Sequence, residues 1–292
     1  MNNILLALSY AFCWGVGQTL TKIALSRIPA TTLLIIQLLS GVAFLAVIYA
    51  FKHQRFPFSQ TTLKQGVAGV FEPALTYMVG IIGLSLTTAS NATLIGASEV
   101  ILTILFAAVF LGEKLTRIKF LLAGTSFLGL VLLMLRDGSP NNASFIGDLL
   151  ILLSTVFAVV YVLVSKKQIG AVEPLRLVVS QQSVGLVMTV VCFGLLSTID
   201  SRYEISIAGI EPHFWLLAIT SGILHYALAF LLYLIALRNL PASQAAFFIA
   251  LVPVFGVASA IVLIGEHPTA VQWLGAGLII ASSYYANRLA PS

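Results

Sequence analysis

Residues 66–124 read GVAGVFEPALTYMVGIIGLSLTTASNATLIGASEVILTILFAAVFLGEKLTRIKFLLAG, and residues 219–277 read ITSGILHYALAFLLYLIALRNLPASQAAFFIALVPVFGVASAIVLIGEHPTAVQWLGAG. Aligned without a gap, the two stretches are identical at 17 of 59 positions. Biased composition alone would give a match at roughly one position in ten. The chain therefore contains an internal repeat with an offset of 153 residues.

The segment that precedes each copy repeats as well, with an offset of 145 residues. The change of offset corresponds to an eight-residue insertion between the predicted seventh and eighth helices. We therefore divide the chain into a first repeat, residues 1–140, and a second repeat, residues 141–292. The identical pairs at this offset are Ser9 and Ser154, Phe12 and Phe157, Lys22 and Lys167, Pro29 and Pro174, and Gln37 and Gln182.

The chain of 292 residues is too apolar for a water-soluble core, with 59% hydrophobic and 9% charged residues and a mean hydropathy of +1.04. A helix needs about 20 apolar residues to cross a hydrocarbon core of about 30 Å. Short separators that carry Pro, Gly or charged residues divide the chain into stretches of about that length. We predict an all-α integral membrane protein whose ten transmembrane helices lie at residues 4–24, 31–51, 66–85, 89–111, 118–135, 147–165, 175–197, 214–236, 241–264 and 270–287.

These helices are predicted to form two inverted five-helix repeats. An odd number of spans in each repeat makes the second copy enter the membrane from the opposite side. With a cytoplasmic N-terminus, eleven Lys and Arg residues fall on the cytoplasmic side and four on the other, as the positive-inside rule requires. We expect both termini in the cytoplasm and a multi-pass protein of the cell inner (cytoplasmic) membrane. The net charge of +5 forms no clustered basic face, so nucleic acid is not an expected partner.

A recurring turn follows the predicted fourth and ninth helices, FLGEKLT at residues 110–116 and LIGEHPT at residues 263–269. Both copies resemble the "LGE-x-LT" turn of the drug/metabolite transporter (DMT) superfamily, EamA-type permeases. Trp14-Gly15 and Pro253-Val254 are also similar to family features, whereas Glu99-Val100 departs from the family's proline in the fourth helix. The resemblance implies a ten-helix fold with a central cavity lined by helices 1–4 and 6–9, with helices 5 and 10 at the periphery.

Three ionisable side chains, Glu72, Glu99 and His225, are predicted to lie at mid-depth in the membrane. A charge there costs about 2.5–3.5 kcal/mol on insertion scales, so it needs a partner or a purpose. Glu72 and His225 are 153 residues apart and therefore occupy equivalent positions in the two repeats. We interpret the three residues as candidates for substrate binding or proton coupling, because each can change its charge during a transport cycle.

Structural roles compete with this interpretation, because buried polar groups also join helices within membranes. Glu72 and His225 could pair with each other instead of serving transport. Glu113 and Glu266 fall at helix ends, where we expect them to cap a helix or to pair with a basic residue of the same loop. The other candidate structural partners are Thr76 and Ser221 for Glu72 and His225, and Lys22 and Gln37 for Glu99.

Eight further residues are predicted to line the cavity. Trp14 and Gln18 lie one turn apart on the first helix, and Tyr161 shares a face of the sixth helix with Phe157 and Ser165. For the aromatic members, the alternative is packing or anchoring at the membrane interface. The predicted set is Trp14, Gln18, Gln37, Tyr77, Tyr161, Gln182, Tyr226 and Phe230.

The sequence contains no ATP-binding loop, metal-ligand cluster or nucleophile elbow, so neither a pump nor an enzyme has support, and no cofactor or metal site is expected. Our leading hypothesis is a secondary-active exporter of amino acids or related small metabolites, with protons as the candidate exchange ion. The alternatives are an importer of a cationic metabolite, nucleobase or vitamin and, more remotely, a membrane enzyme or receptor-like scaffold. The expected partners are the solute, the lipid bilayer and, at most, a second copy in a weak homodimer; otherwise the protein acts as a monomer.

Overall fold

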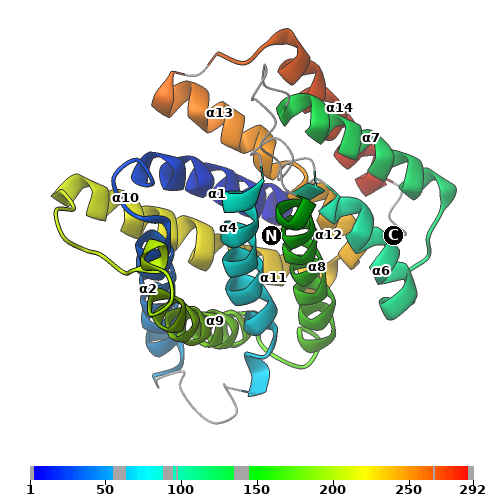
Figure 1. Ribbon diagram of the computed structural model, residues 1–292. Helices are drawn as coiled ribbons and strands as arrows, with labels where there is room; N and C mark the ends of the chain where they lie inside the picture. Colours follow the sequence, from blue (N-terminus) through cyan, green and yellow to red (C-terminus); the bar gives the residue numbers. More distant parts are fainter. Residues whose placement is uncertain are drawn as a thin grey trace.

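The structure, a computed structural model, describes residues 3–54, 64–87, 95–96, 98–134, 145–265 and 267–288, and these residues contain helices but no strand (Figure 1). The first repeat contains α1 (Asn3–Ala24), α2 (Ala30–His53), the π-helical segment η1 (Val70–Leu75), α4 (Thr76–Leu86), α6 (Glu99–Leu111) and α7 (Arg117–Met134). The second contains α8 (Phe145–Gln168), α9 (Pro174–Ser197), the short η2 (Ser201–Tyr203), α10 (Pro212–Gly222), the π-helical segment η3 (Ile223–Leu228), α11 (Ala229–Asn239), α12 (Ala242–Ile249), α13 (Val252–Ile264) and α14 (Ala270–Arg288).

Within the described residues, six stretches of helix are long and apolar enough to cross a membrane. Two further apolar helices are shorter, Val70–Leu84 and Glu99–Leu111. The predicted helix 89–111 begins outside the described residues, as does the predicted boundary between the repeats at residue 140. The prediction of a helical membrane protein is confirmed, whereas the count of ten spans stays a prediction. The six stretches are Asn3–Ala24, Ala30–His53, Phe145–Gln168, Pro174–Ser197, Pro212–Asn239 and Ala242–Ile264.

The internal repeat of the sequence reappears in the helix boundaries. The two π-helical segments begin 153 residues apart, and so do α6 and α13. Gly112 and Gly265, also 153 residues apart, end these two helices in the left-handed conformation, with φ of 69° and 71°. Glycine reaches this conformation without the steric cost that a Cβ atom brings. The glycine of the repeated turn therefore stops a helix at the same point in both repeats.

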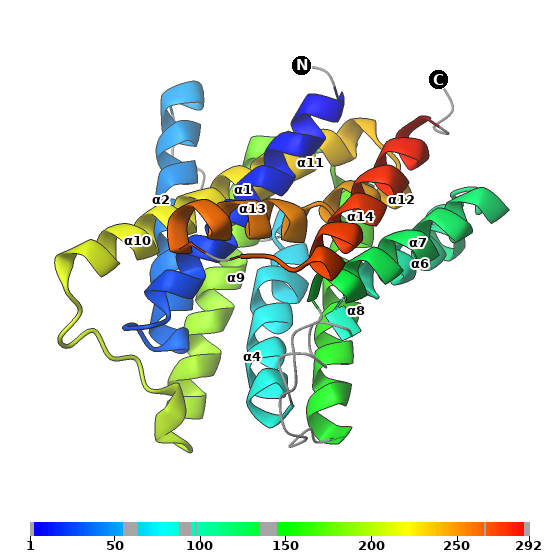
Figure 2. The same ribbon diagram turned by 90° about the horizontal axis from the view of Figure 1, so that it is seen from above.

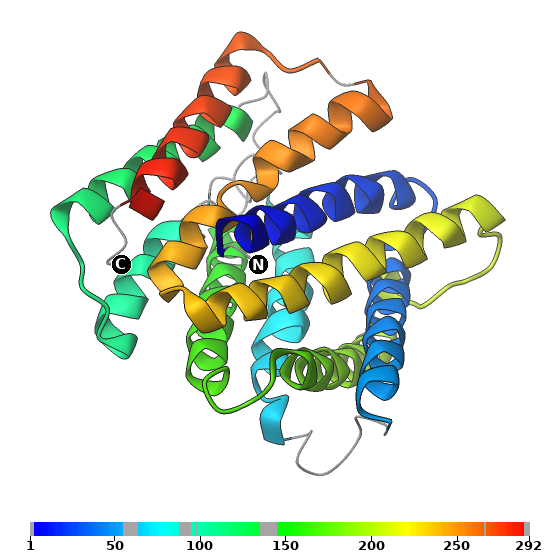
Figure 3. The same ribbon diagram turned by 180° about the vertical axis from the view of Figure 1, so that it is seen from behind.

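The helices of one repeat pack mainly against helices of the other (Figures 1 and 3). The η1–α4 helix of the first repeat contacts α8 and α9, while the equivalent α10–η3–α11 helix of the second contacts α1 and α2. The peripheral pair α7 and α14 lie side by side. Figure 2 shows the first turn of α1 and the last turn of α14 on the same side of the molecule. The two repeats therefore share one core.

Polar contacts join the repeats at their ends as well. Lys52 at the end of α2 donates to the Glu173 carboxylate before α9 at 2.5 Å, and His53 lies 3.0 Å from the same carboxylate. Glu113, in the turn between α6 and α7, accepts hydrogen bonds from the backbone N–H groups of Ala242 and Ser243, at 2.6 and 3.1 Å, and from the Ser243 hydroxyl. Glu113 therefore caps a helix, as predicted, but that helix is α12 of the other repeat; Glu266 lies outside the described residues.

Replacing Glu113 with glutamine is expected to lower the free energy of unfolding by about 1–2 kcal/mol, because one acceptor oxygen of the cap becomes an N–H donor that faces other donors. The loss would appear as a lower midpoint of thermal unfolding in detergent. Glu211→Gln is the matched control, since Glu211 is exposed and its one ion pair within the described residues is a 3.5 Å contact with His213. An equal midpoint for the two variants would contradict the capping role.

Candidate functional site

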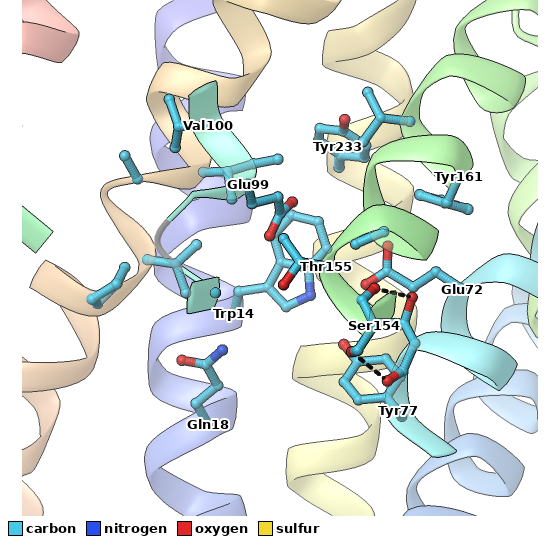
Figure 4. A pocket seen from close by; sticks show the side chains of 18 of the residues that line it. Trp14, Gln18, Glu72, Tyr77, Glu99, Val100, Ser154, Thr155, Tyr161 and Tyr233 are labelled. Carbon is cyan, nitrogen blue, oxygen red and sulfur yellow. Dashed lines mark hydrogen bonds between the residues drawn. The ribbon is translucent and has the colours of Figure 1, made fainter. Parts of the chain in front are cut away.

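A cavity of about 380 Å³ lies between the helices of the two repeats (Figure 4). Residues of α1, η1, α4, α6 and α7 of the first repeat line it, together with residues of α8, η3, α11, α12 and α13 of the second. Because a helix of each repeat packs across the other repeat, the cavity draws its wall from both halves of the chain. This volume falls in the range of small-molecule sites.

Seven of the eleven predicted site residues line this cavity. They include all three ionisable candidates, Glu72, Glu99 and His225. The cost of a charge within the membrane thus identified three residues that line one cavity. The role of these three residues in transport stays a prediction. The other four are Trp14, Gln18, Tyr77 and Tyr161.

Four predicted cavity residues lie outside the wall. Gln37 is buried on α2, where its side-chain N–H groups donate to Thr21 at 2.7 Å and to Ser221 at 2.8 Å. Gln182 is buried on α9, which packs against η1 and contributes no residue to the lining. Tyr226 and Phe230 are buried and pack against aromatic rings that line the cavity. The ring centroid of Phe230 lies 5.0 Å from that of Trp14, and the ring centroid of Tyr226 lies 5.4 Å from that of Tyr77. These four residues position helices and rings instead of facing the cavity.

The lining also departs from what the family resemblance implied. Neither α2 nor α9, the predicted second and seventh helices, reaches the cavity, whereas Leu130 of α7, on a helix expected at the periphery, does. On α8 the face that lines the cavity carries Ser154, Thr155 and Ala158, while Phe157 packs its ring against Phe71 instead. Their spacing of three and four residues matches one helical face, so periodicity alone could have found it.

The backbone of Glu72 leaves the helical conformation, with φ of −142° and ψ of 125°. The cause is Pro73, whose ring disfavours the helical conformation of the preceding residue. The break lies within η1 at the cavity wall, and the equivalent segment η3 places His225 at the same cavity. Irregular helices that line a cavity in both repeats are typical of transporter binding sites.

No hydrogen bond joins Glu72 to His225 among the residues that the structure describes. The Tyr77 hydroxyl is 3.0 Å from Nε2 of His225, and Glu72 lines the same cavity. The predicted alternative partners bond elsewhere: the Thr76 hydroxyl donates to the Phe71 carbonyl oxygen, and the Ser221 hydroxyl donates to that of Ala218. Tyr77 of the first repeat and His225 of the second therefore form a polar contact across the two repeats at the cavity wall.

Glu99 stands in the first turn of α6, and its carboxyl group points toward Trp14 and Thr155 in Figure 4. Glu72 lines the same cavity. Gln37, one of the predicted structural partners of Glu99, is engaged by Thr21 and Ser221. Glu99 therefore presents its carboxyl group to the cavity.

The cavity contains two carboxyl groups, and no Lys or Arg lines it among the residues that the structure describes. Trp14 and Tyr161 add aromatic rings, which attract cations through their faces. Two carboxylates repel each other unless a cation or a proton compensates for their charge. The charge distribution therefore favours a cationic group over an anionic one.

Residues 1–135 and 145–288 each match the model of the family described as the EamA-like transporter family. A solved structure described only as "Crystal structure of protein" superposes with a TM-score of 0.79 at 18% sequence identity, over 99% of this chain and 99% of that chain. This likeness extends to the fold alone. A search of curated proteins found no match.

Proposed function

Because the chain belongs to the EamA-like transporter family, we propose that this membrane transporter is a secondary-active carrier that exports an amine-bearing metabolite, such as an amino acid, in exchange for protons. The observation that carries this proposal is a cavity with two carboxyl groups and, among the described residues, no Lys or Arg. Glu72, Glu99 and His225 are the proposed binding and coupling groups. Trp14, Gln18, Tyr77 and Tyr161 complete the proposed binding surface.

The proposed architecture has ten spans in two inverted five-helix repeats, residues 1–140 and 141–292, with both termini cytoplasmic in the inner membrane. Two repeats related by an axis in the membrane plane can exchange conformations, which converts an inward-open state into an outward-open state of similar energy. The repeated helix breaks at η1 and η3 support this mechanism. A monomer or a weak homodimer suffices, because helices of one chain form the cavity wall.

Exchange follows from competition for the carboxyl groups. A carboxylate that has taken up a proton no longer attracts an ammonium group, and a bound ammonium group disfavours protonation. Suppose the carrier changes conformation only when a proton or an ammonium group neutralises its carboxylates. It would then move amine in one direction and protons in the other. Import of a cationic metabolite would use the same chemistry, and deletion of the gene would distinguish the two, because an importer mutant starves whereas an exporter mutant accumulates solute.

The test uses purified protein in liposomes that contain a pH-sensitive dye. Lysine, glutamine, threonine and putrescine are added in turn, with succinate as the anionic control. We expect at least one amine, but not succinate, to drive a pH change that Glu72→Gln, Glu99→Gln or His225→Ala reduces in a folded protein. If no solute moves protons and all variants behave like the wild type, proton exchange at this cavity is refuted.

A further inference from the structure

We infer that α1 carries a second polar subsite of the cavity, in which the indole N–H of Trp14 and the side-chain amide of Gln18 donate hydrogen bonds to an oxygen atom of the solute. The carrier therefore selects solutes that bear a carboxylate or carbonyl oxygen beside the amine, and it discriminates against amines that lack this oxygen. The inference rests on the proposed function, because it divides the recognition of one solute between two parts of the same cavity wall.

Trp14 is a rigid part of this wall. The residue is 9% exposed, and its ring centroid lies 5.7, 5.0 and 5.4 Å from those of Tyr10, Phe230 and Tyr233. The indole nitrogen has no hydrogen-bond partner among the described residues, yet it is not one of the buried atoms that lack a partner. Since Trp14 lines the cavity, its N–H group faces the open space. A donor held in place by packed rings binds a solute with little loss of conformational freedom.

Most hydroxyl groups of the wall have already used their hydrogen. Those of Thr76, Ser154 and Thr155 donate to backbone carbonyl oxygens at 2.9, 2.7 and 3.0 Å. The Tyr161 hydroxyl donates to the side-chain oxygen of Gln181 at 3.2 Å. A hydroxyl group has a single hydrogen, so these four residues have no donor left for a solute.

The remaining polar rings of the wall are engaged or closed off. The Tyr77 hydroxyl lies 3.0 Å from Nε2 of His225. Nδ1 of His225 and the Tyr233 hydroxyl lack a partner, but both atoms are buried and do not reach the open space. In the part of the chain that the structure describes, Trp14 and Gln18 are therefore the lining residues whose N–H groups have no partner and face the cavity.

Gln18 lies one helical turn after Trp14, so the two side chains extend from the same face of α1 (Figure 4). Gln18 lines the cavity and is exposed, and its amide supplies two N–H donors. The carboxyl groups come from other elements, Glu72 from η1 and Glu99 from α6. The cavity thus offers donors from α1 and acceptors from η1 and α6.

A solute that carries an ammonium group and a nearby oxygen matches this division. Its ammonium group compensates for the carboxylates, whereas its oxygen accepts hydrogen bonds from α1. A solute carboxylate beside Glu72 or Glu99 would meet a like charge, so it is directed to α1. An amine without an oxygen leaves the Trp14 N–H unpaired when it displaces water from the cavity. An unpaired polar group in a binding site is an effective means of discrimination.

The first test detects the hydrogen bond itself by NMR. Protein with nitrogen-15-labelled tryptophan gives indole signals from three tryptophans, and Trp14→Phe assigns the signal of Trp14. Alanine, leucine and lysine are compared with ethylamine, isoamylamine and cadaverine, the amines that remain when the carboxylate is removed. We expect at least one amino acid, and none of the amines, to move the Trp14 indole proton downfield in a saturable way. No shift with any amino acid, or an equal shift with its amine, would overturn the subsite.

The second test removes the donor but keeps the size of the ring. Replacing Trp14 with benzothienylalanine exchanges the indole N–H for sulfur. The wild type is expected to bind the responding amino acid at least about tenfold more tightly than its amine, and the variant is expected to bind the two equally. The same replacement at Trp273, which is 58% exposed on α14 and outside the cavity lining, is the control. An unchanged ratio of affinities in the Trp14 variant refutes the subsite.

Gln18→Met provides a second variant in case the first does not fold, because Gln18 is exposed and its substitution disturbs no packed ring. It is expected to lower the same ratio, and an unchanged ratio would remove Gln18 from the subsite. Equal losses for the amino acid and its amine would show that the substituted residue only maintains the shape of the cavity. A wild type that binds an amino acid at Trp14 but moves no protons refutes the proposed exchange and supports the subsite.

Discussion

Replacing Glu99 with glutamine is expected to weaken amine binding by about tenfold to a hundredfold. The substitution keeps the size of the side chain but removes one of the two carboxyl groups that line the cavity. A hydrogen bond to a charged group contributes about 1.5–3 kcal/mol, and each 1.4 kcal/mol changes a dissociation constant about tenfold. Isothermal titration calorimetry with the amine selected by the liposome screen measures the change.

Glu204→Gln provides the control, because Glu204 is an exposed carboxylate beyond α9 and is not among the residues that line the cavity. The affinity of a neutral solute should not change in Glu99→Gln, since the lost attraction is specific to positive charge. Equal losses for amine and neutral solutes would show that Glu99 only maintains the shape of the cavity. Unchanged amine affinity would remove Glu99 from the proposed binding site.

Replacing Gly69 with alanine is expected to lower the free energy of unfolding by about 3 kcal/mol or more, the upper part of the range for overpacking. A Cβ atom at Gly69 would lie 1.9 Å from the carbonyl oxygen of Gln181 and 2.6 Å from its carbonyl carbon. Both contacts are with backbone, so no side-chain rotation can relieve them, and the η1 helix must move away from α9. The variant should elute as aggregate in size-exclusion chromatography or unfold at a much lower temperature.

Gly222 is the equivalent residue of the second repeat, and a Cβ atom there would lie 2.5 Å from the Gln37 carbonyl oxygen. Gly222→Ala should therefore show the same defect at the contact between α10 and α2. Gly124→Ala is the control, because nothing lies within 4 Å of its added Cβ atom and alanine favours a helix by about 1 kcal/mol. A stable Gly69→Ala protein would mean that the two helices are not in contact as described.

The internal repeat made the helical architecture predictable, because two similar stretches of sequence are expected to form equivalent helices. Glu72, Glu99 and His225 could be found at the cavity because a charge in the membrane is too costly without a purpose. Gln37 and Gln182 were assigned to the cavity by the same repeat, but an amide also serves to join helices. Gln37 on α2 donates hydrogen bonds to Thr21 on α1 and Ser221 on α10. A single sequence does not reveal that these three side chains meet.

The rotation of each helix was harder to predict than its position. A helix that faces lipid on one side and protein on the other is apolar all round, so its polar pattern gives little direction. Tyr161 lines the cavity, yet Ser165, on the same predicted helix face, accepts a hydrogen bond from Gln181 and does not line it. The π-helical segments were not predicted either, since only the first repeat carries a proline, Pro73, at that point.

The interlocked packing of the repeats has a consequence for how this protein could have arisen from half its length. The η1–α4 helix is covered by α8 and α9, and α7 is covered by α14, so one repeat alone would leave these surfaces open. A single ancestral repeat could bury them only against a second copy of itself. Gene fusion would then preserve contacts that already existed between two chains. Divergence at paired positions, such as Glu72 with His225 and Tyr77 with Phe230, would then be possible, because each half of a fused chain can change independently of the other.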